Sequence, residues 1–204
     1  MTRRIGILMY PEVEVLDFAG PHEVFTTASR MAARSAPQAP PLFEVCTLAR
    51  VPGLCRARAG LQALADHGLQ LHPRLDVLLV PGGVTTAEQR QADTLQWLSR
   101  TAPGCEIVAS VCTGAFLLAD AGLLPAGTPV TTHWEDLDDL QRAHPALQVL
   151  PGRRWVDCGR LVTSAGISAG IDMSLHLVER LAGRALAERT ARQMDFDWTE
   201  DAPP

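Results

Sequence analysis

Cys112 occupies a position in which a thiol could act as a nucleophile. It lies at the join between a predicted buried strand, Glu106–Val111, and a predicted apolar helix, Thr113–Ala121, with the small residues Ser110 and Gly114 close on either side. A strand that turns sharply into a helix at a nucleophilic residue is typical of a nucleophile elbow, because small neighbours let the turn close and direct the central side chain into a cleft. The pattern makes Cys112 a candidate for covalent chemistry.

The elbow would place Cys112 at a helix N-terminus, where the helix dipole favours the thiolate and lowers the thiol pKa. The backbone N–H of Thr113 would then point at a negative charge that develops beside the sulfur. A cysteine that only fills the core fits the same pattern, since free cysteines are among the most buried residues. The remaining cysteines lack this setting and are expected to be core or surface thiols: Cys46, Cys55, Cys105 and Cys158.

Two other segments are expected to converge on the cleft. Gly82 and Gly83 follow a predicted strand, Leu75–Val80, and could bring backbone N–H groups close to a ligand as part of an oxyanion site, or could simply end the strand. Asp17 lies between apolar residues just before a predicted helix. It could cap that helix or form an Asx turn, or it could project beside Cys112, protonated or sharing a proton with the thiol.

The elements that must position these residues alternate along the chain. Apolar strands that alternate with helices indicate an α/β fold, with a mostly parallel sheet covered by helices on both faces. Ligands bind such a sheet at the carboxyl ends of its strands. The predicted strands are Arg3–Met9, Phe43–Leu48, Leu75–Val80, Glu106–Val111, Thr128–Thr132 and a hairpin over Arg154–Thr163. The predicted helices are His22–Ala33, Thr85–Thr101, Thr113–Ala121, Glu135–Ala143, Ser168–Leu181 and Ala185–Met194.

Two stretches do not follow this pattern. The segment Val51–Leu71 is irregular, and its periodicity predicts neither helix nor strand. The acidic tail, residues 195–204, is expected to fray, although Phe196 and Trp198 could dock on the rest of the protein. Residues 1–194 are predicted to form one domain, which suits the length of 204 residues.

Composition excludes several classes of function. All 18 basic residues are arginines, so the chain has no lysine for a Schiff base or for a P-loop phosphate site. The net charge of -5 argues against nucleic-acid binding. No apolar run approaches the roughly 18 residues of a membrane helix, and the N-terminus does not resemble a signal peptide. Five cysteines without a C-x-x-C pair predict a cytoplasmic protein with reduced thiols.

The charged residues also bear on the ligand. The arginines nearest in sequence to Cys112 are Arg100 and Arg142, both on predicted surface helices. Without a basic patch at the cleft, a neutral small molecule is a better substrate than an anion. The six histidines show no metal-ligand spacing, so no metal site is predicted.

Further motifs run in order along the chain, from residue 5 to about residue 192: Ile5–Leu8 with Pro11–Val13, Leu16–Pro21, Val80–Gly83, Ser110–Gly114, Thr131–Trp134 and Leu161–Asp172. Together they resemble the PfpI/ThiJ superfamily, whose fold is like that of class I glutamine amidotransferases. Within it, the likeness is greatest to bacterial isocyanide hydratases and to the amidotransferase-like halves of AraC-type regulators.

The resemblance implies a flavodoxin-like three-layer sandwich, usually a homodimer. It implies that Cys112 is the nucleophile and that Asp17 is the essential acid. Thr113 is then the hydroxyl-bearing residue that directly follows the nucleophile. Gly82 and Gly83 become oxyanion donors, chiefly Gly83. Peptidase-like members carry a histidine directly after the cysteine, and Thr113 at that position argues against protease activity.

The function implied is the cofactor-free hydration of an isocyanide to an N-substituted formamide. His133 is expected to be mainly a structural signature of this branch, with a secondary catalytic role as the alternative. Two other functions stay open: a small-molecule sensor, and a cysteine-based glyoxalase or thiol stress protein. Direct transcriptional regulation is not expected, because a helix-turn-helix domain of about a hundred residues would have to follow.

Overall fold

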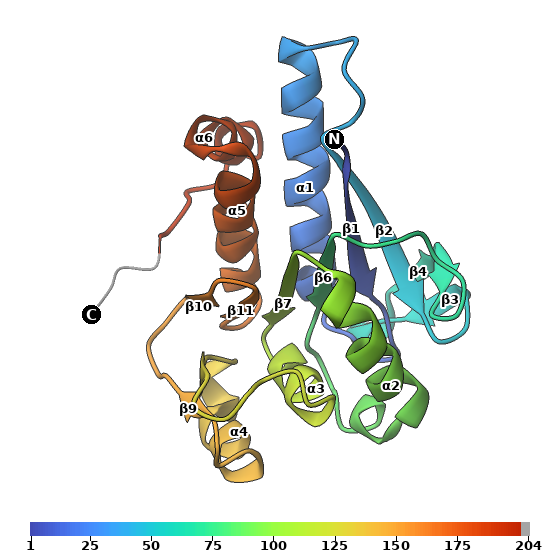
Figure 1. The fold of residues 1–204 in the computed structure, drawn as a ribbon, viewed down its shortest axis with the longest axis vertical. Coiled ribbons are helices and arrows are strands. Elements are labelled where there is room, and N and C mark those ends of the chain that lie inside the picture. The colour runs from blue at the N-terminus through green and yellow to red at the C-terminus, as the bar shows by residue number, and fades with distance from the viewer. Residues whose placement is uncertain (201–204) are drawn as a thin grey trace.

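The computed structural model describes residues 1–200, in which a seven-stranded sheet runs through the middle of the fold (Figure 1). Its strands lie in the order β10-β11-β7-β6-β1-β2-β5, and every neighbouring pair is parallel except β10 and β11. The bounds are β1 Arg3–Leu8, β2 Phe43–Ala49, β5 His67–Gly68, β6 Val77–Val80, β7 Ile107–Val111, β10 Trp155–Cys158 and β11 Leu161–Ser164.

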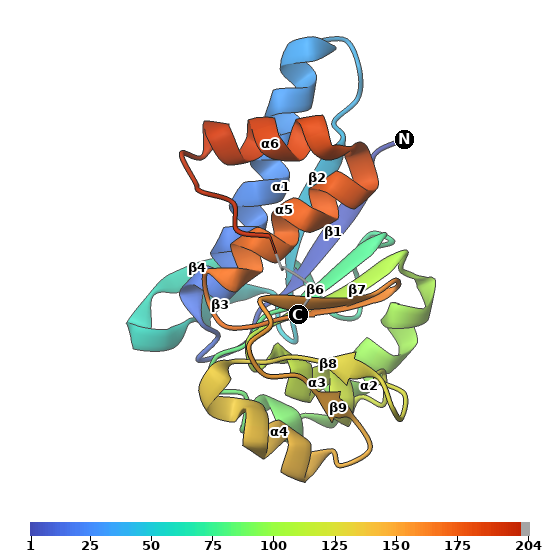
Figure 2. The same cartoon turned by 90° about the vertical axis from the view of Figure 1, so that its left-hand side faces the viewer.

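The middle strands β6 and β7 are apolar except for Ser110, because helices cover both faces of the sheet. Every residue of β6 and β7 is buried, as expected for a parallel sheet inside a sandwich. Figure 2 shows α1, α5 and α6 on one side of the sheet and α2, α3 and α4 on the other. This confirms the flavodoxin-like α/β fold. The bounds are α1 Val15–Ser35, α2 Ala92–Thr101, α3 Gly114–Asp120, α4 Leu137–Ala143, α5 Ala169–Ala182 and α6 Arg184–Gln193.

Short elements connect these layers. A parallel pair, β8 Pro129–Val130 and β9 Gln148–Val149, lies next to α4, and 3-10 turns precede α2 and α4 at Glu88–Arg90 and Trp134–Asp136. The helices predicted to start at Thr85 and Glu135 therefore begin later, at Ala92 and Leu137. Among residues 1–200, no helix combines the length and the apolar character needed to cross a membrane.

The first helix begins well before the predicted start at His22. Helix α1 starts at Val15 and contains Pro21, so Asp17 lies in its first turn and does not precede the helix. Proline has no N–H for the carbonyl four residues earlier, which here belongs to Asp17. The prediction was wrong because it placed Pro21 in the first turn, whereas the helix continues through it at the loss of one backbone hydrogen bond.

The segment that the sequence pattern did not resolve forms a β-hairpin. Strands β3 Gly53–Arg56 and β4 Gln62–Ala65 pair antiparallel, joined by a 3-10 turn at Arg58–Gly60. Leu54, Leu61 and Leu64 are exposed on the hairpin and its turn. These strands are short and carry apolar residues on their outer face. Their sequence therefore shows neither the alternation of apolar and polar residues of a half-buried strand nor the continuous apolar run of a buried strand.

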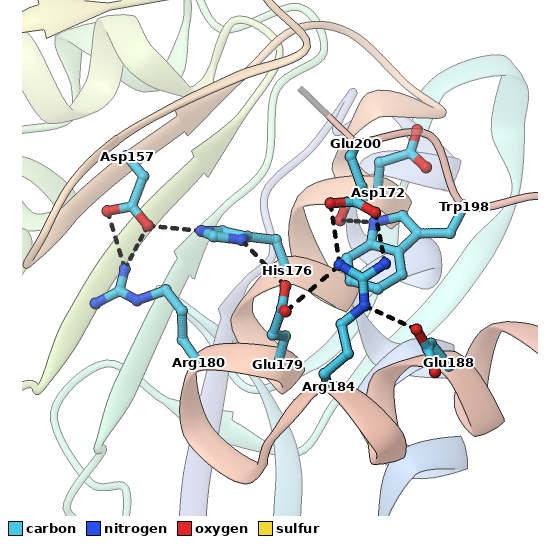
Figure 3. A network of polar contacts seen from close by, with 9 residues as sticks. All are labelled: Asp157, Asp172, His176, Glu179, Arg180, Arg184, Glu188, Trp198 and Glu200. Atoms are coloured by element: carbon cyan, nitrogen blue, oxygen red, sulfur yellow. Dashed lines mark hydrogen bonds and ion pairs between the residues drawn. The ribbon is translucent and has the colours of Figure 1, made fainter. Parts of the chain in front are cut away.

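The start of the acidic tail packs against α5 and α6, as Figure 3 shows. The indole Nε1 of Trp198 donates to the Asp172 carbonyl at 3.2 Å, and the Thr199 N–H donates to Asp172 Oδ1 at 2.8 Å. Arg184 lies over the Trp198 ring and pairs with Glu200 at 2.6 Å. Trp198, Thr199 and Glu200 thus contact α5 and the start of α6, and Phe196 and Trp198 pack against the core, as the sequence left open. Residues 201–204 of the tail lie outside the described residues.

Candidate active site

Cys112 connects β7 to α3 in a strained backbone conformation. Its φ of 56° lies in the left-handed region, which a non-glycine residue adopts only where its surroundings hold it. The Cys112 N–H donates to the carbonyls of Ser164 and Ala165, each at 3.2 Å, and the Thr132 hydroxyl donates to the Cys112 carbonyl at 2.8 Å. The backbone thus has the strand–turn–helix geometry of a nucleophile elbow.

Glycines make room for this turn. A Cβ atom on Gly114 would overlap the carbonyl oxygen of Val80, at the end of the neighbouring strand β6. A Cβ atom on Gly82 would lie 2.5 Å from both the backbone nitrogen and the hydroxyl oxygen of Thr113. The end of β6 and the elbow therefore touch through backbone atoms, and side chains at these two positions would force them apart.

Asp17 approaches the elbow from the first turn of α1. Its side chain is 1% exposed, and its Oδ2 accepts a hydrogen bond from the Gly82 N–H at 3.1 Å. Its Oδ1 is buried and accepts no hydrogen bond of ordinary geometry from residues 1–200. Burial raises the pKa of Asp17 to about 7, against the lowering effect of the Gly82 amide and the neighbouring Cys112 thiol. This carboxyl can therefore exchange a proton near neutral pH.

The thiol of Cys112 does not have the lowered pKa that its helix N-terminal position predicted. Burial and the nearby charge of Asp17 raise the pKa of Cys112 to about 12, although the Thr113 N–H acts in the opposite direction. The prediction was wrong because α3 is short and Cys112 is only 6% exposed, so the cost of burying the thiolate exceeds the favourable field of the helix end. The resting thiol is protonated and needs a base.

Thr113 ties the elbow to the end of β6. Its hydroxyl donates to the Gly83 carbonyl at 2.9 Å and accepts from the Gly83 N–H, also at 2.9 Å. The two glycine amides proposed as oxyanion donors are therefore both engaged, that of Gly82 by Asp17 and that of Gly83 by Thr113. The backbone N–H of Thr113, which lowers the pKa of the Cys112 thiol, remains beside the sulfur as a donor.

A pocket of about 480 Å³ opens over the elbow. Cys112, Thr113, Gly83 and His133 line it, whereas Asp17 and Gly82 are not part of its lining. The His133 Nδ1 lies 3.4 Å from Asp136 Oδ2 and accepts from the Glu135 N–H, so this ring nitrogen caps the following 3-10 turn. The structure thus brings together five of the predicted site residues around the elbow and places His133 at the pocket wall.

The pocket also contains residues that the sequence analysis did not select. They come from the residue before α1, the hairpin turn, the segment after Gly83, α3, the acidic segment after His133 and the loop before α5: Glu14, Arg58, Val84, Thr85, Thr86, Gln89, Phe116, Glu135, Asp136, Asp139 and Ile167. Arg58 pairs with Glu14 at 3.1 Å. The acidic residues that follow the Thr-His-Trp motif could have indicated this wall of the pocket, but they were interpreted as a solvated helix face. Among residues 1–200, no three His, Cys, Asp or Glu side chains are grouped so that they could hold a metal ion.

The fold and the site define an α/β protein with a cysteine elbow beside a buried acid. The chain belongs to the DJ-1/PfpI family, whose model matches residues 3–180. The isonitrile hydratase of Pseudomonas putida is 33% identical over 206 residues, covering 100% of this chain and 82% of that protein.

Two further relatives are of different kinds. A ThiJ/PfpI family protein from Pseudomonas syringae has a structure that superimposes with a TM-score of 0.83 at 28% identity, over 100% of this chain and 78% of that one. The HTH-type transcriptional regulator GbdR of Pseudomonas aeruginosa is 31% identical over 193 residues. That match covers 95% of this chain but only 50% of the regulator. The family relationship is therefore shared by enzymes and regulators.

Proposed function

We propose that the protein is a cysteine-dependent isocyanide hydratase, a lyase that adds water to an isocyanide and releases an N-substituted formamide. The observation that carries the proposal is the pairing of a protonated thiol, Cys112, with a buried carboxyl, Asp17, whose pKa is raised to about 7. The similarity to an isonitrile hydratase over the whole chain supports it, since isonitrile and isocyanide are two names for one functional group.

In the first step, the carboxylate of Asp17 accepts the thiol proton while the sulfur of Cys112 bonds to the terminal carbon of the isocyanide. The sulfur supplies the electron pair of the new bond, and one carbon–nitrogen π pair moves onto the nitrogen. The lone pair that the carbon already carried then takes the proton back from Asp17. The product is a thioimidate, in which the carbon carries one hydrogen, a bond to sulfur and a double bond to nitrogen. The Thr113 N–H stabilises negative charge at the sulfur before the new bond forms.

In the second step, water adds to the thioimidate carbon and one of its protons goes to the nitrogen. The carbon–sulfur bond then breaks, the hydroxyl proton passes to the sulfur by way of Asp17, and the formamide leaves. Cys112 and Asp17 return to their starting protonation states, so the cycle consumes one isocyanide and one water and needs no cofactor.

We further propose that the enzyme is a cytoplasmic homodimer. Residues 1–200 contain five free cysteines, which suits a reducing compartment. Three exposed leucines on the β3–β4 hairpin and its turn, Leu54, Leu61 and Leu64, offer an apolar surface that a second copy would cover.

An activity panel tests the proposed reaction. Purified enzyme is incubated with para-nitrophenyl isocyanide, followed by its absorbance change, and in parallel with methylglyoxal. We expect turnover of the isocyanide to the formamide and none of the aldehyde, because the mechanism needs an electrophilic carbon that can also accept a proton. Turnover of methylglyoxal alone would contradict the proposal and favour a glyoxalase.

A second candidate is a ligand-binding domain without chemistry. The similarity to GbdR over 95% of this chain favours it, since that protein is a transcriptional regulator. Calorimetry separates the two functions: an isocyanide or its formamide that binds in the pocket while no substrate is consumed would support the sensor.

A further inference from the structure

Acidic side chains dominate the pocket over Cys112. Four carboxylates line it, those of Glu14, Glu135, Asp136 and Asp139, against one arginine, Arg58. Independently of these acids, the pocket is marked as a ligand site by the nucleophile in its lining. Beside that nucleophile, behind the lining, Asp17 is 1% exposed and accepts a hydrogen bond from the Gly82 N–H at 3.1 Å.

The charges of this lining do not cancel. Arg58 is paired with Glu14 at 3.1 Å, and Asp139 is paired with Arg142. Glu135 and Asp136 are left facing His133, whose Nδ1 lies 3.9 Å from the former and 3.4 Å from the latter. One histidine can compensate at most one of these two carboxylates, so this side of the pocket carries an excess of negative charge.

Burial raises the pKa of Asp136, and the neighbouring carboxylates of Asp139 and Glu135 raise it further, although His133 acts in the opposite direction. A positively charged group placed beside Asp136 would relieve this repulsion and gain favourable interaction with both acids. An anionic ligand would be repelled, in agreement with the expectation from the sequence.

We infer that the substrate carries a cationic group, an ammonium or quaternary ammonium, which binds beside Glu135 and Asp136 while its isocyanide carbon reaches Cys112. This inference rests on the proposed hydratase function and replaces the neutral substrate expected from the sequence. The acids line the same pocket as the nucleophile, so one small molecule can contact both.

A pair of isosteric substrates tests the charge directly. One is 3-isocyanopropyl-trimethylammonium, and the other replaces its quaternary nitrogen with carbon, giving a tert-butyl group of the same shape. We expect kcat/KM to be about tenfold or more higher for the cation at low ionic strength and the ratio to shrink as salt is added. Equal or higher kcat/KM for the neutral isostere would overturn the inference while leaving the hydratase function intact.

Variants assign the effect to the two acids. The double substitution Glu135→Gln/Asp136→Asn should bring the cation-to-neutral ratio close to one. Asp138→Asn removes one negative charge from the exposed face of α4, outside the pocket lining, and should keep the wild-type ratio. A double variant with the wild-type ratio would contradict the assignment.

Binding distinguishes a failure of the inference from a failure of the proposed function. If wild-type protein turns over neither isocyanide, the hydratase function is wrong, and calorimetry with Cys112→Ala then measures the affinity for each probe. Tighter binding of the trimethylammonium probe would support the cationic ligand, and equal binding of the two would refute it.

Discussion

Asp17→Asn is expected to reduce kcat/KM for an isocyanide by about a hundredfold to ten-thousandfold, the range that general acid–base catalysis supplies. The asparagine amide has the same shape, and its oxygen can keep the hydrogen bond from the Gly82 N–H, which Asp17 accepts at 3.1 Å. It cannot accept the proton of the Cys112 thiol, whose pKa of about 12 leaves it protonated. The change thus removes the base and leaves the pocket in place.

The pH dependence of the wild-type enzyme tests the same role. Below pH 7 the carboxyl of Asp17, with a pKa of about 7, is increasingly protonated, and neither it nor the thiol can accept a proton. We expect kcat/KM to fall about tenfold per pH unit below that point and to level off above it. A profile that is flat from pH 5 to pH 9, or one that rises toward acid, would show that Asp17 is not the base.

The same substitution should stabilise the protein in neutral and alkaline solution. The folded-state pKa of Asp17 is raised from 3.8 to about 7, so between these values the folded protein holds a proton that the unfolded chain releases. Stability therefore falls as pH rises through that window, by up to about 4 kcal/mol when fully developed. Asp17→Asn removes this loss, and its free energy of unfolding in urea should exceed that of the wild type at pH 8 but not at pH 4.

Gly114→Ala is expected to destabilise the fold by about 3 kcal/mol or more, at the upper end of the range for overpacked sites. The added methyl group would overlap the carbonyl oxygen of Val80, a backbone atom in the buried strand β6 that has little freedom to move. Relief would require α3 and the Cys112 elbow to shift away from the sheet, so activity should fall together with stability.

Urea unfolding measures this effect against a matched control. Gly104→Ala makes the same chemical change where a Cβ atom would meet no neighbour within 4 Å, and the unfolding midpoint should stay close to that of the wild type. If Gly114→Ala unfolds at the same urea concentration as Gly104→Ala, the close contact between the elbow and β6 does not limit this position.

The elbow could be predicted from the sequence because its requirements are local. A buried strand, a helix and small residues at Ser110 and Gly114 all occur within a dozen positions of Cys112. The same was not true of α1, whose start depends on packing that lets the helix continue through Pro21. The tail is likewise fixed by tertiary contacts, those of Trp198 and Thr199 with Asp172.

The electrostatics of the site could not be predicted, because they depend on burial. The N-terminal position of Cys112 favoured a lowered thiol pKa, but the loops that enclose the sulfur and the approach of Asp17 reverse the direction. The acidic pocket wall arises similarly. Glu14 is separated from Asp136 by more than half the chain, and no pattern in the sequence shows that they line one cavity.

The central claim is that Cys112 is the nucleophile in isocyanide hydration, and turnover of para-nitrophenyl isocyanide by Cys112→Ala tests it most directly. We expect a loss of at least about a thousandfold, as for other nucleophile deletions, with an unfolding midpoint near that of the wild type. The exposed thiol of Cys158 supplies the control, since Cys158→Ala should turn over normally. Wild-type turnover by Cys112→Ala would contradict covalent catalysis at this site.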